Sequence, residues 1–138
     1  MAKNKKKSSN FARYNTYLKM ESTTQLVETI IKGIEEKKGS DIVVVDLQDL
    51  ESAICQYFII CQGNSPTQVG AIAESVGETV RNEVDEKPTA VVGLENAQWV
   101  AMDFTDVMVH IFLPDVRAYY DMEHLWDDAV LTRIENNN

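Results

Sequence analysis

The fold is decided by the stretch Trp99-Val-Ala-Met-Asp-Phe-Thr-Asp-Val-Met-Val-His-Ile-Phe112. It contains two runs rich in apolar and β-branched residues, Trp99 to Phe104 and Val107 to Leu113, which are typical of strands. Only Thr105 and Asp106 separate them, and so short a connection predicts a β-hairpin. We therefore expect two antiparallel neighbours at the centre of this half of the chain.

The meander extends in both directions from this hairpin. A third short strand is predicted from Thr89 to Val92, joined to Trp99 through a turn at Glu95-Asn96. Pro114 ends the sheet because it lacks the N–H that a strand ladder needs. A last helix is predicted from Asp115 to about Ala129.

The first half of the chain predicts two helices and two buried strands. Ser22 and Gln25 fit a capping box, which predicts that the first helix starts near Thr23 and runs to Lys38. The second helix has Ser65 as its N-cap, and its apolar stripe ends at Val84. Between the helices lie the β-branched run Asp41–Asp46 and the apolar run Tyr57–Cys61. The order α-β-β-α-β-β-β-α indicates an α/β protein with a mixed sheet and packed helices.

Charge is unevenly distributed along the chain. Residues 1–21 hold six basic residues and one acidic residue, whereas the whole chain of 138 residues carries a formal net charge of −9. We expect 1–21 to be a flexible basic arm, with Met20 as an alternative start, 22–130 to be one domain, and 131–138 to be a frayed tail. An acidic domain repels phosphate backbones and favours basic proteins, so no direct DNA partner is expected.

No apolar run is long enough to span a bilayer, so no membrane partner is expected. Cys55 and Cys61 lie among apolar neighbours and are interpreted as buried thiols, in keeping with a cytoplasmic protein.

The usual arrangements of catalytic or metal-binding residues do not occur in the sequence. It has neither a dinucleotide fingerprint nor a Walker loop. His110 has no Cys or His partner at ligand spacing and is interpreted as a hydrogen-bonded structural residue. Asp103 and Asp106 flank the hairpin turn; they are either turn residues or a carboxylate pair able to hold Mg²⁺. We expect no catalytic residue, no metal and no cofactor.

One segment has the composition of a binding surface. Alternation places Trp99, Ala101 and Asp103 on one face of their strand, and the last helix adds four side chains of the types enriched at protein contacts. These are Tyr119, Tyr120, Met122 and Trp126. The other interpretation is that they pack against the second face of the sheet.

Several motifs together resemble the ribosome silencing factor (RsfS/Iojap) family. They are Gly39–Leu47, Tyr57–Ser65, Trp99–Phe112 and, in the closing helix, Arg117–Trp126. The resemblance spans roughly 23–128. The chain departs from the family pattern at Gln56, where Asp is usual, at Thr105, where Gly is usual, and at Pro66.

The resemblance implies a nucleotidyltransferase-like fold without that superfamily's metal-binding carboxylates. It also implies a homodimer when free, and binding to the large ribosomal subunit through a basic protein on its joining face. Such binding blocks the small subunit and represses translation. The contact surface expected here consists of Trp99, Ala101, Asp103, Asp106, His110, Tyr120 and Glu123.

Two alternatives remain open at this point. A nucleotide-binding or nucleotidyltransferase-type enzyme has the same fold, and fold alone does not determine function. An RNA contact through the basic arm is the other alternative.

Overall fold

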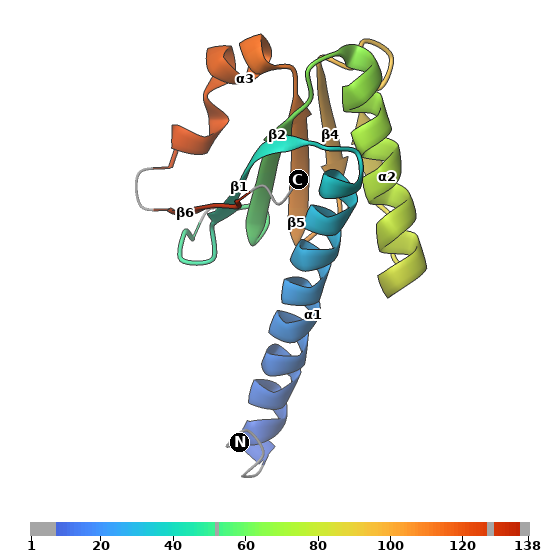
Figure 1. Ribbon diagram of the computed structural model, residues 1–138. Coiled ribbons are helices and arrows are strands. Elements are labelled where there is room, and N and C mark those ends of the chain that lie inside the picture. Colours follow the sequence, from blue (N-terminus) through green and yellow to red (C-terminus); the bar gives the residue numbers. More distant parts are fainter. Residues whose placement is uncertain (1–7, 52, 127–128, 136–138) are drawn as a thin grey trace.

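A computed structural model describes residues 8–51, 53–126 and 129–135 of the chain, with side chains from Glu21 onward. Six strands form one mixed sheet in the order β3-β4-β5-β2-β1-β6 (Figure 1). The strands are β1 (Ser40–Asp46), β2 (Tyr57–Gln62), β3 (Ala90–Val92), β4 (Trp99–Asp103), β5 (Val107–Phe112) and β6 (Val130–Arg133). The helices are α1 (Ser8–Glu36), α2 (Pro66–Val84), α3 (Pro114–Tyr120) and the 3₁₀ turn η2 (Met122–His124). The predicted mixed α/β architecture is confirmed.

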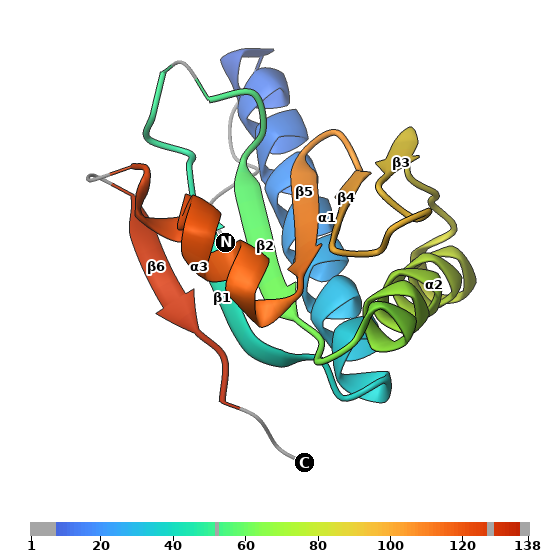
Figure 2. The ribbon, with the colours of Figure 1, turned by 90° about the horizontal axis from the view of Figure 1, so that it is seen from above.

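The two faces of the sheet are covered differently. Helices α1 and α2 lie side by side on one face, and α3 lies on the other (Figure 2). Because side chains alternate along a strand, β5 contributes to two cores. Val107, Val109 and Ile111 pack toward α1 and α2, whereas Phe112 packs toward α3. Since α3 and η2 are short, they cover less of their face than the two long helices cover of theirs.

The predicted meander β3-β4-β5 is confirmed, with both of its strand pairs antiparallel. Its first turn contains Gly93 at φ 95°, where an added Cβ would lie 2.1 Å from the carbonyl oxygen of Trp99. Only glycine fits there. Strand β5 also pairs in parallel with β2, with Ile60 opposite His110. This pairing joins the two halves of the chain into one sheet.

The first helix begins earlier than predicted. It starts at Ser8, not Thr23, so Ser22 lies inside the helix and does not cap it. The segment 8–20 contains neither Gly nor Pro, so nothing in it stops a helix from continuing upstream of the capping pattern. Figure 1 shows this part of α1 extending beyond the sheet. The division into an arm at 1–21 and a domain at 22–130 stays a prediction.

The end of the chain also differs from the prediction of one helix to Ala129. Helix α3 stops at Tyr120 because Asp121 adopts the left-handed conformation, at φ 47°. The turn η2 follows, and then β6 pairs antiparallel with β1. Residues 131–133, predicted as part of a frayed tail, therefore form most of a strand.

The N-terminus of α2 is capped as predicted. The Ser65 hydroxyl accepts a hydrogen bond from the backbone N–H of Gln68 at 3.1 Å. The side chain of Gln68 accepts from the N–H of Asn64 at 2.7 Å and donates to the carbonyl oxygens of Lys37 and Lys38. The cap thus also joins the start of α2 to the end of α1.

A buried ion pair fixes α3 and η2 on the sheet. Arg117 donates two hydrogen bonds to the Glu123 carboxylate, at 3.0 and 3.1 Å. Its third nitrogen donates to the Asp41 carbonyl oxygen at 2.7 Å and to the Gln62 side chain at 3.1 Å. Arg117 is 7% exposed and Glu123 6%. One guanidinium therefore connects α3, η2, β1 and β2.

Both thiols are buried, as predicted, and neither cysteine is disulfide-bonded. Burial raises the pKa of the Cys55 thiol to about 11 and that of Cys61 to about 12. Both therefore stay protonated at neutral pH and are poor nucleophiles. Within the described ranges, no helix combines the length and apolar character needed to cross a membrane.

The two Ser positions allow a test of where the helices begin. Ser65→Ala should lower the free energy of unfolding by about 1 kcal/mol, because the first turn of α2 loses its cap. Ser22→Ala should have no such cost, because Ser22 lies inside α1. Urea denaturation measures both; a Ser22→Ala loss as large as that of Ser65→Ala would contradict a helix that starts at Ser8.

The buried ion pair should contribute strongly to stability when one partner alone is removed. Arg117→Met should lower the unfolding free energy by about 3–5 kcal/mol, because Glu123 keeps a buried charge. Adding Glu123→Leu should restore much of the loss. Lys32→Met is the matched control, since the Lys32–Glu83 pair is exposed and such pairs contribute little. Equal urea midpoints for Arg117→Met and Lys32→Met would contradict this account.

Candidate functional site

The indole of Trp99 lies at the centre of an aromatic cluster between β4 and α3. It stacks on Phe112, with ring centroids 5.0 Å apart and an interplanar angle of 29°. The ring centroid of Tyr120 lies 4.8 Å from that of Trp99, and Tyr120 in turn contacts Tyr119 edge-to-face at 5.0 Å. Trp99 is half-buried. The cluster thus runs from Phe112, in the second core (the one between the sheet and α3), out to the surface.

The Trp99 indole is hydrogen-bonded to His110. The Trp99 indole N–H donates a hydrogen bond to His110 Nδ1 at 3.0 Å, and His110 is only 4% exposed. This confirms the interpretation of His110 as a hydrogen-bonded structural histidine. Because Nδ1 accepts, the ring proton of the neutral imidazole must be on Nε2.

The second nitrogen of His110 has no hydrogen-bond partner in the described part of the chain. The ring instead meets Phe58 edge-to-face, with centroids 4.9 Å apart at 72°. A buried polar atom without a partner costs about 1–3 kcal/mol. The position therefore carries an energetic cost that an apolar side chain would avoid.

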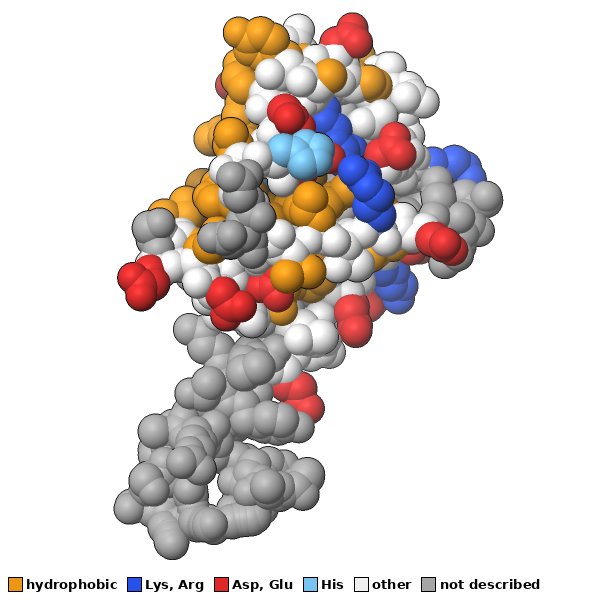
Figure 3. All heavy atoms as spheres, turned by 90° about the vertical axis from the view of Figure 1, so that its left-hand side faces the viewer, with side chains coloured by type: hydrophobic (Ala, Val, Ile, Leu, Met, Phe, Trp, Pro, Cys, Tyr) orange, Lys and Arg blue, Asp and Glu red, His pale blue; other side chains and the backbone are white. Residues whose placement is uncertain are grey.

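The outer side of this cluster forms an exposed surface, which we call the β4–α3 face. It consists of Val92, Trp99, Ala101, Tyr119 and Tyr120. Val92 pairs with Ala101 across the sheet and is 61% exposed, while Tyr119 and Tyr120 are 81% and 47% exposed. Figure 3 shows the side of the molecule that carries α3 and β6, where hydrophobic side chains gather beside scattered acidic ones. Apolar and aromatic area of this kind is typical of a protein contact.

Asp103 and Asp106 lie at the hairpin end of this face, and both are half-buried. The Asp103 carboxylate accepts a hydrogen bond from the backbone N–H of Thr105 at 2.8 Å. This confirms the turn role for Asp103. Thr105 itself adopts φ 76°, a conformation in which glycine is favoured. Among the described residues, no group of three or more His, Cys, Asp or Glu side chains is arranged to hold a metal ion.

The structure separates the seven predicted contact residues into two sets. Trp99, Ala101 and Tyr120 belong to the β4–α3 face, with Asp103 and Asp106 beside it. His110 and Glu123 are buried, at 4% and 6% exposed, so little of either side chain is accessible to a partner; their place in the contact stays a prediction. Both are supporting residues, because His110 holds Trp99 and Glu123 holds Arg117.

Sequence reasoning missed Arg117 as an anchor and Val92 as part of the face. An Arg and a Glu six residues apart do not meet on a regular helix, so their pairing leaves no periodic signal. For Met122 and Trp126 the alternative interpretation, packing against the second face of the sheet, is the one that applies. They pack into the second core, where Trp126 contacts Phe58 at 5.0 Å.

Stability should depend on the protonation of His110. Burial lowers its pKa to about 4, and its ring neighbours are the uncharged side chains Phe58, Trp99 and Phe112. Because the unfolded pKa is about 6.5, the stabilising contribution is complete above pH 6.5 and is lost as pH falls to 4. The loss reaches about 3 kcal/mol.

Urea denaturation of the parent and of His110→Leu at several pH values measures this effect. Because the two proteins differ only at position 110, the difference between their unfolding free energies isolates the contribution of His110. A difference that stays constant from pH 7 to pH 4 would contradict the buried, neutral imidazole.

Comparison with known proteins places the chain in a family. Residues 20–138 match the family model described as "Ribosomal silencing factor during starvation". The chain is 37% identical over 114 residues to the ribosomal silencing factor RsfS of Halalkalibacterium halodurans, covering 83% of this chain and 96% of that protein. It is 38% identical over 104 residues to RsfS of Bacillus subtilis, covering 73% and 84%.

A solved structure agrees with these matches. A crystal structure of a Chromobacterium violaceum protein superimposes with a TM-score of 0.71 at 34% identity, covering 83% of this chain and 95% of that one. The family model and the sequence relatives identify the same family, and the fold matches a solved structure at 34% identity. The chain belongs to the RsfS family of ribosomal silencing factors.

Proposed function

We propose that this protein represses translation by binding the large ribosomal subunit, through a basic ribosomal protein on the joining face, and excluding the small subunit. Family membership supports a role in silencing ribosomes. The bound domain acts by occupying space and needs no catalytic step. We place this activity in the cytoplasm and infer that the free protein is a homodimer.

The observation that carries this proposal is the composition of the β4–α3 face. The half-buried Trp99 contacts Tyr120, which in turn contacts Tyr119. Asp103 lies at the far end of the same strand, and Asp106 lies in the turn that follows. Trp and Tyr are the residue types that most often anchor protein contacts, because they bury a large area at low entropic cost. The site thus has anchors, and its rim carries negative charge.

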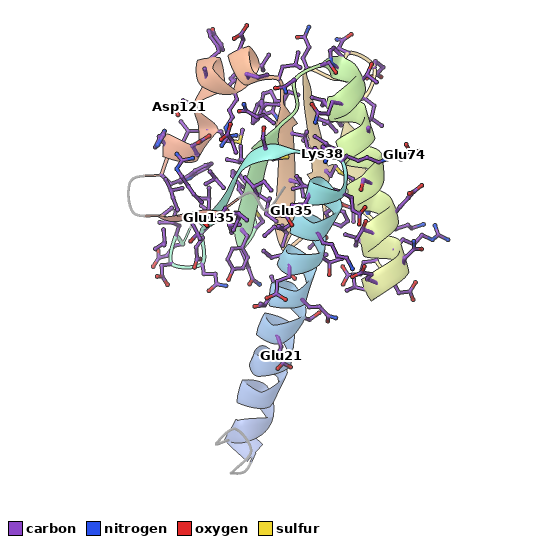
Figure 4. The ribbon with its side chains drawn as sticks, in the orientation of Figure 1. Glu21, Glu35, Lys38, Glu74, Asp121 and Glu135 are labelled. Atoms are coloured by element: carbon purple, nitrogen blue, oxygen red, sulfur yellow. The ribbon has the colours of Figure 1, made fainter. Side chains whose placement is uncertain are left out.

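Charge supports a basic protein as the partner. The formal net charge of the chain is −9, and acidic side chains lie on several sides of the molecule. Figure 4 shows Glu74 pointing outward from α2 and Asp121 at the end of α3, on the opposite side. Such a field speeds encounter with Lys- and Arg-rich surfaces, and Asp103 and Asp106 would fix the register of the contact.

Sedimentation of separated ribosomal subunits tests the proposal. Saturating protein should reduce the joined particle, and the protein should sediment with the large subunit alone. Joining that is unchanged at saturation would refute the steric mechanism, while sedimentation with the small subunit would refute the choice of partner.

Trp99→Ala should weaken binding to the large subunit at least tenfold, about 1.4 kcal/mol, because the face loses its central anchor. Leu131→Ala is the matched control. It removes an exposed apolar side chain from β6, at the other edge of the sheet. Binding titrations measure both, and equal affinities for the two variants would remove Trp99 from the contact.

A further inference from the structure

Position 110 carries a polar side chain where the strand otherwise contributes apolar ones. Val109, Ile111 and Phe112 around it are fully buried, and His110 itself is 4% exposed. Its Nε2 has no hydrogen-bond partner among the described residues. For core packing alone, an aliphatic side chain of similar size would be better at this position.

The need of the Trp99 indole N–H for an acceptor does not by itself explain why position 110 is a histidine. Trp99 is half-buried, so water could reach its N–H if the indole turned outward. What the 3.0 Å bond to Nδ1 does fix is the orientation of the ring. The same orientation stacks the indole on Phe112 and sets it against Tyr120.

We propose that His110 is a positioning residue, which holds the Trp99 indole in the orientation that the ribosomal partner contacts. This rests on the function proposed above. A side chain fixed before association loses less conformational entropy on binding, so the affinity is higher than for a mobile anchor. The unpartnered Nε2 is then the cost of placing an acceptor under the indole.

Two substitutions at position 110 separate positioning from packing. His110→Leu removes the acceptor and the unpartnered nitrogen, so its urea midpoint should equal or exceed that of the parent. His110→Asn keeps an acceptor near the place of Nδ1 but leaves space in the core, so its midpoint should fall. If His110 had only a structural role, the more stable variant, His110→Leu, would also be the one that binds large subunits more tightly.

The proposal predicts the opposite order for binding to purified large subunits. His110→Leu should bind about fivefold more weakly than the parent, equivalent to about 1 kcal/mol, and His110→Asn should bind more tightly than His110→Leu. Trp99→Phe lacks the indole N–H, so adding His110→Leu to it should change affinity no further. If His110→Asn does not fold, this double variant carries the same test.

The indole N–H resonance of Trp99, assigned in a Trp126→Phe background, reports on the free protein. His110→Leu should shift this resonance and speed its exchange with solvent. An unchanged resonance overturns the proposal, and so does parent-like affinity of His110→Leu. A third outcome is that His110→Leu changes the resonance but the parent protein itself does not bind large subunits. His110 would then orient Trp99 without a role in binding, and the proposed function would be the part that failed.

Discussion

The bidentate ion pair between Arg117 and Glu123 determines how the second face of the sheet is covered. Both charges are buried, and desolvation of each is costly unless its hydrogen bonds are complete. Arg117 meets that condition by also donating to Asp41 and Gln62. Because these acceptors lie on β1 and β2, they hold α3 against this part of the sheet. That docking puts Tyr120 against Trp99, so the β4–α3 face depends on it.

The same face exists because the sheet is covered unequally. Alternation along β4 and β5 gives both faces apolar side chains, and α1 and α2 are long enough to cover one of them. On the other face α3 has seven residues and η2 three. The apolar side chains of Trp99 and Ala101 consequently remain partly accessible. The proposed binding surface is thus a face of the sheet that its short helices leave partly uncovered.

Much of this could be predicted from the sequence, because the signals are local. The hairpin Trp99–Phe112 follows from residue types and a two-residue connection, and the start of α2 follows from Ser65 and Pro66. The end of α3 could not be predicted in this way. An apolar period continues past Tyr120, but Asp121 takes the left-handed conformation so that Glu123 can reach Arg117. Arg117 and Glu123 are close in sequence, but Asp41 and Gln62, which hold Arg117 on the sheet, are 76 and 55 residues away, so local sequence does not reveal the arrangement.

The same limit explains why the predicted contact set mixes two kinds of residue. Period-2 alternation assigns a residue to a face, and it did so correctly for Trp99, Ala101 and Asp103. It carries no information on depth, which depends on how far α3 extends over that face. His110 is on the same face as Trp99, but it is buried between the rings of Trp99 and Phe58. Glu123 is likewise buried, although it belongs to a short surface turn. A surface deduced from strand alternation therefore includes buried residues together with accessible ones, and only burial separates the two kinds.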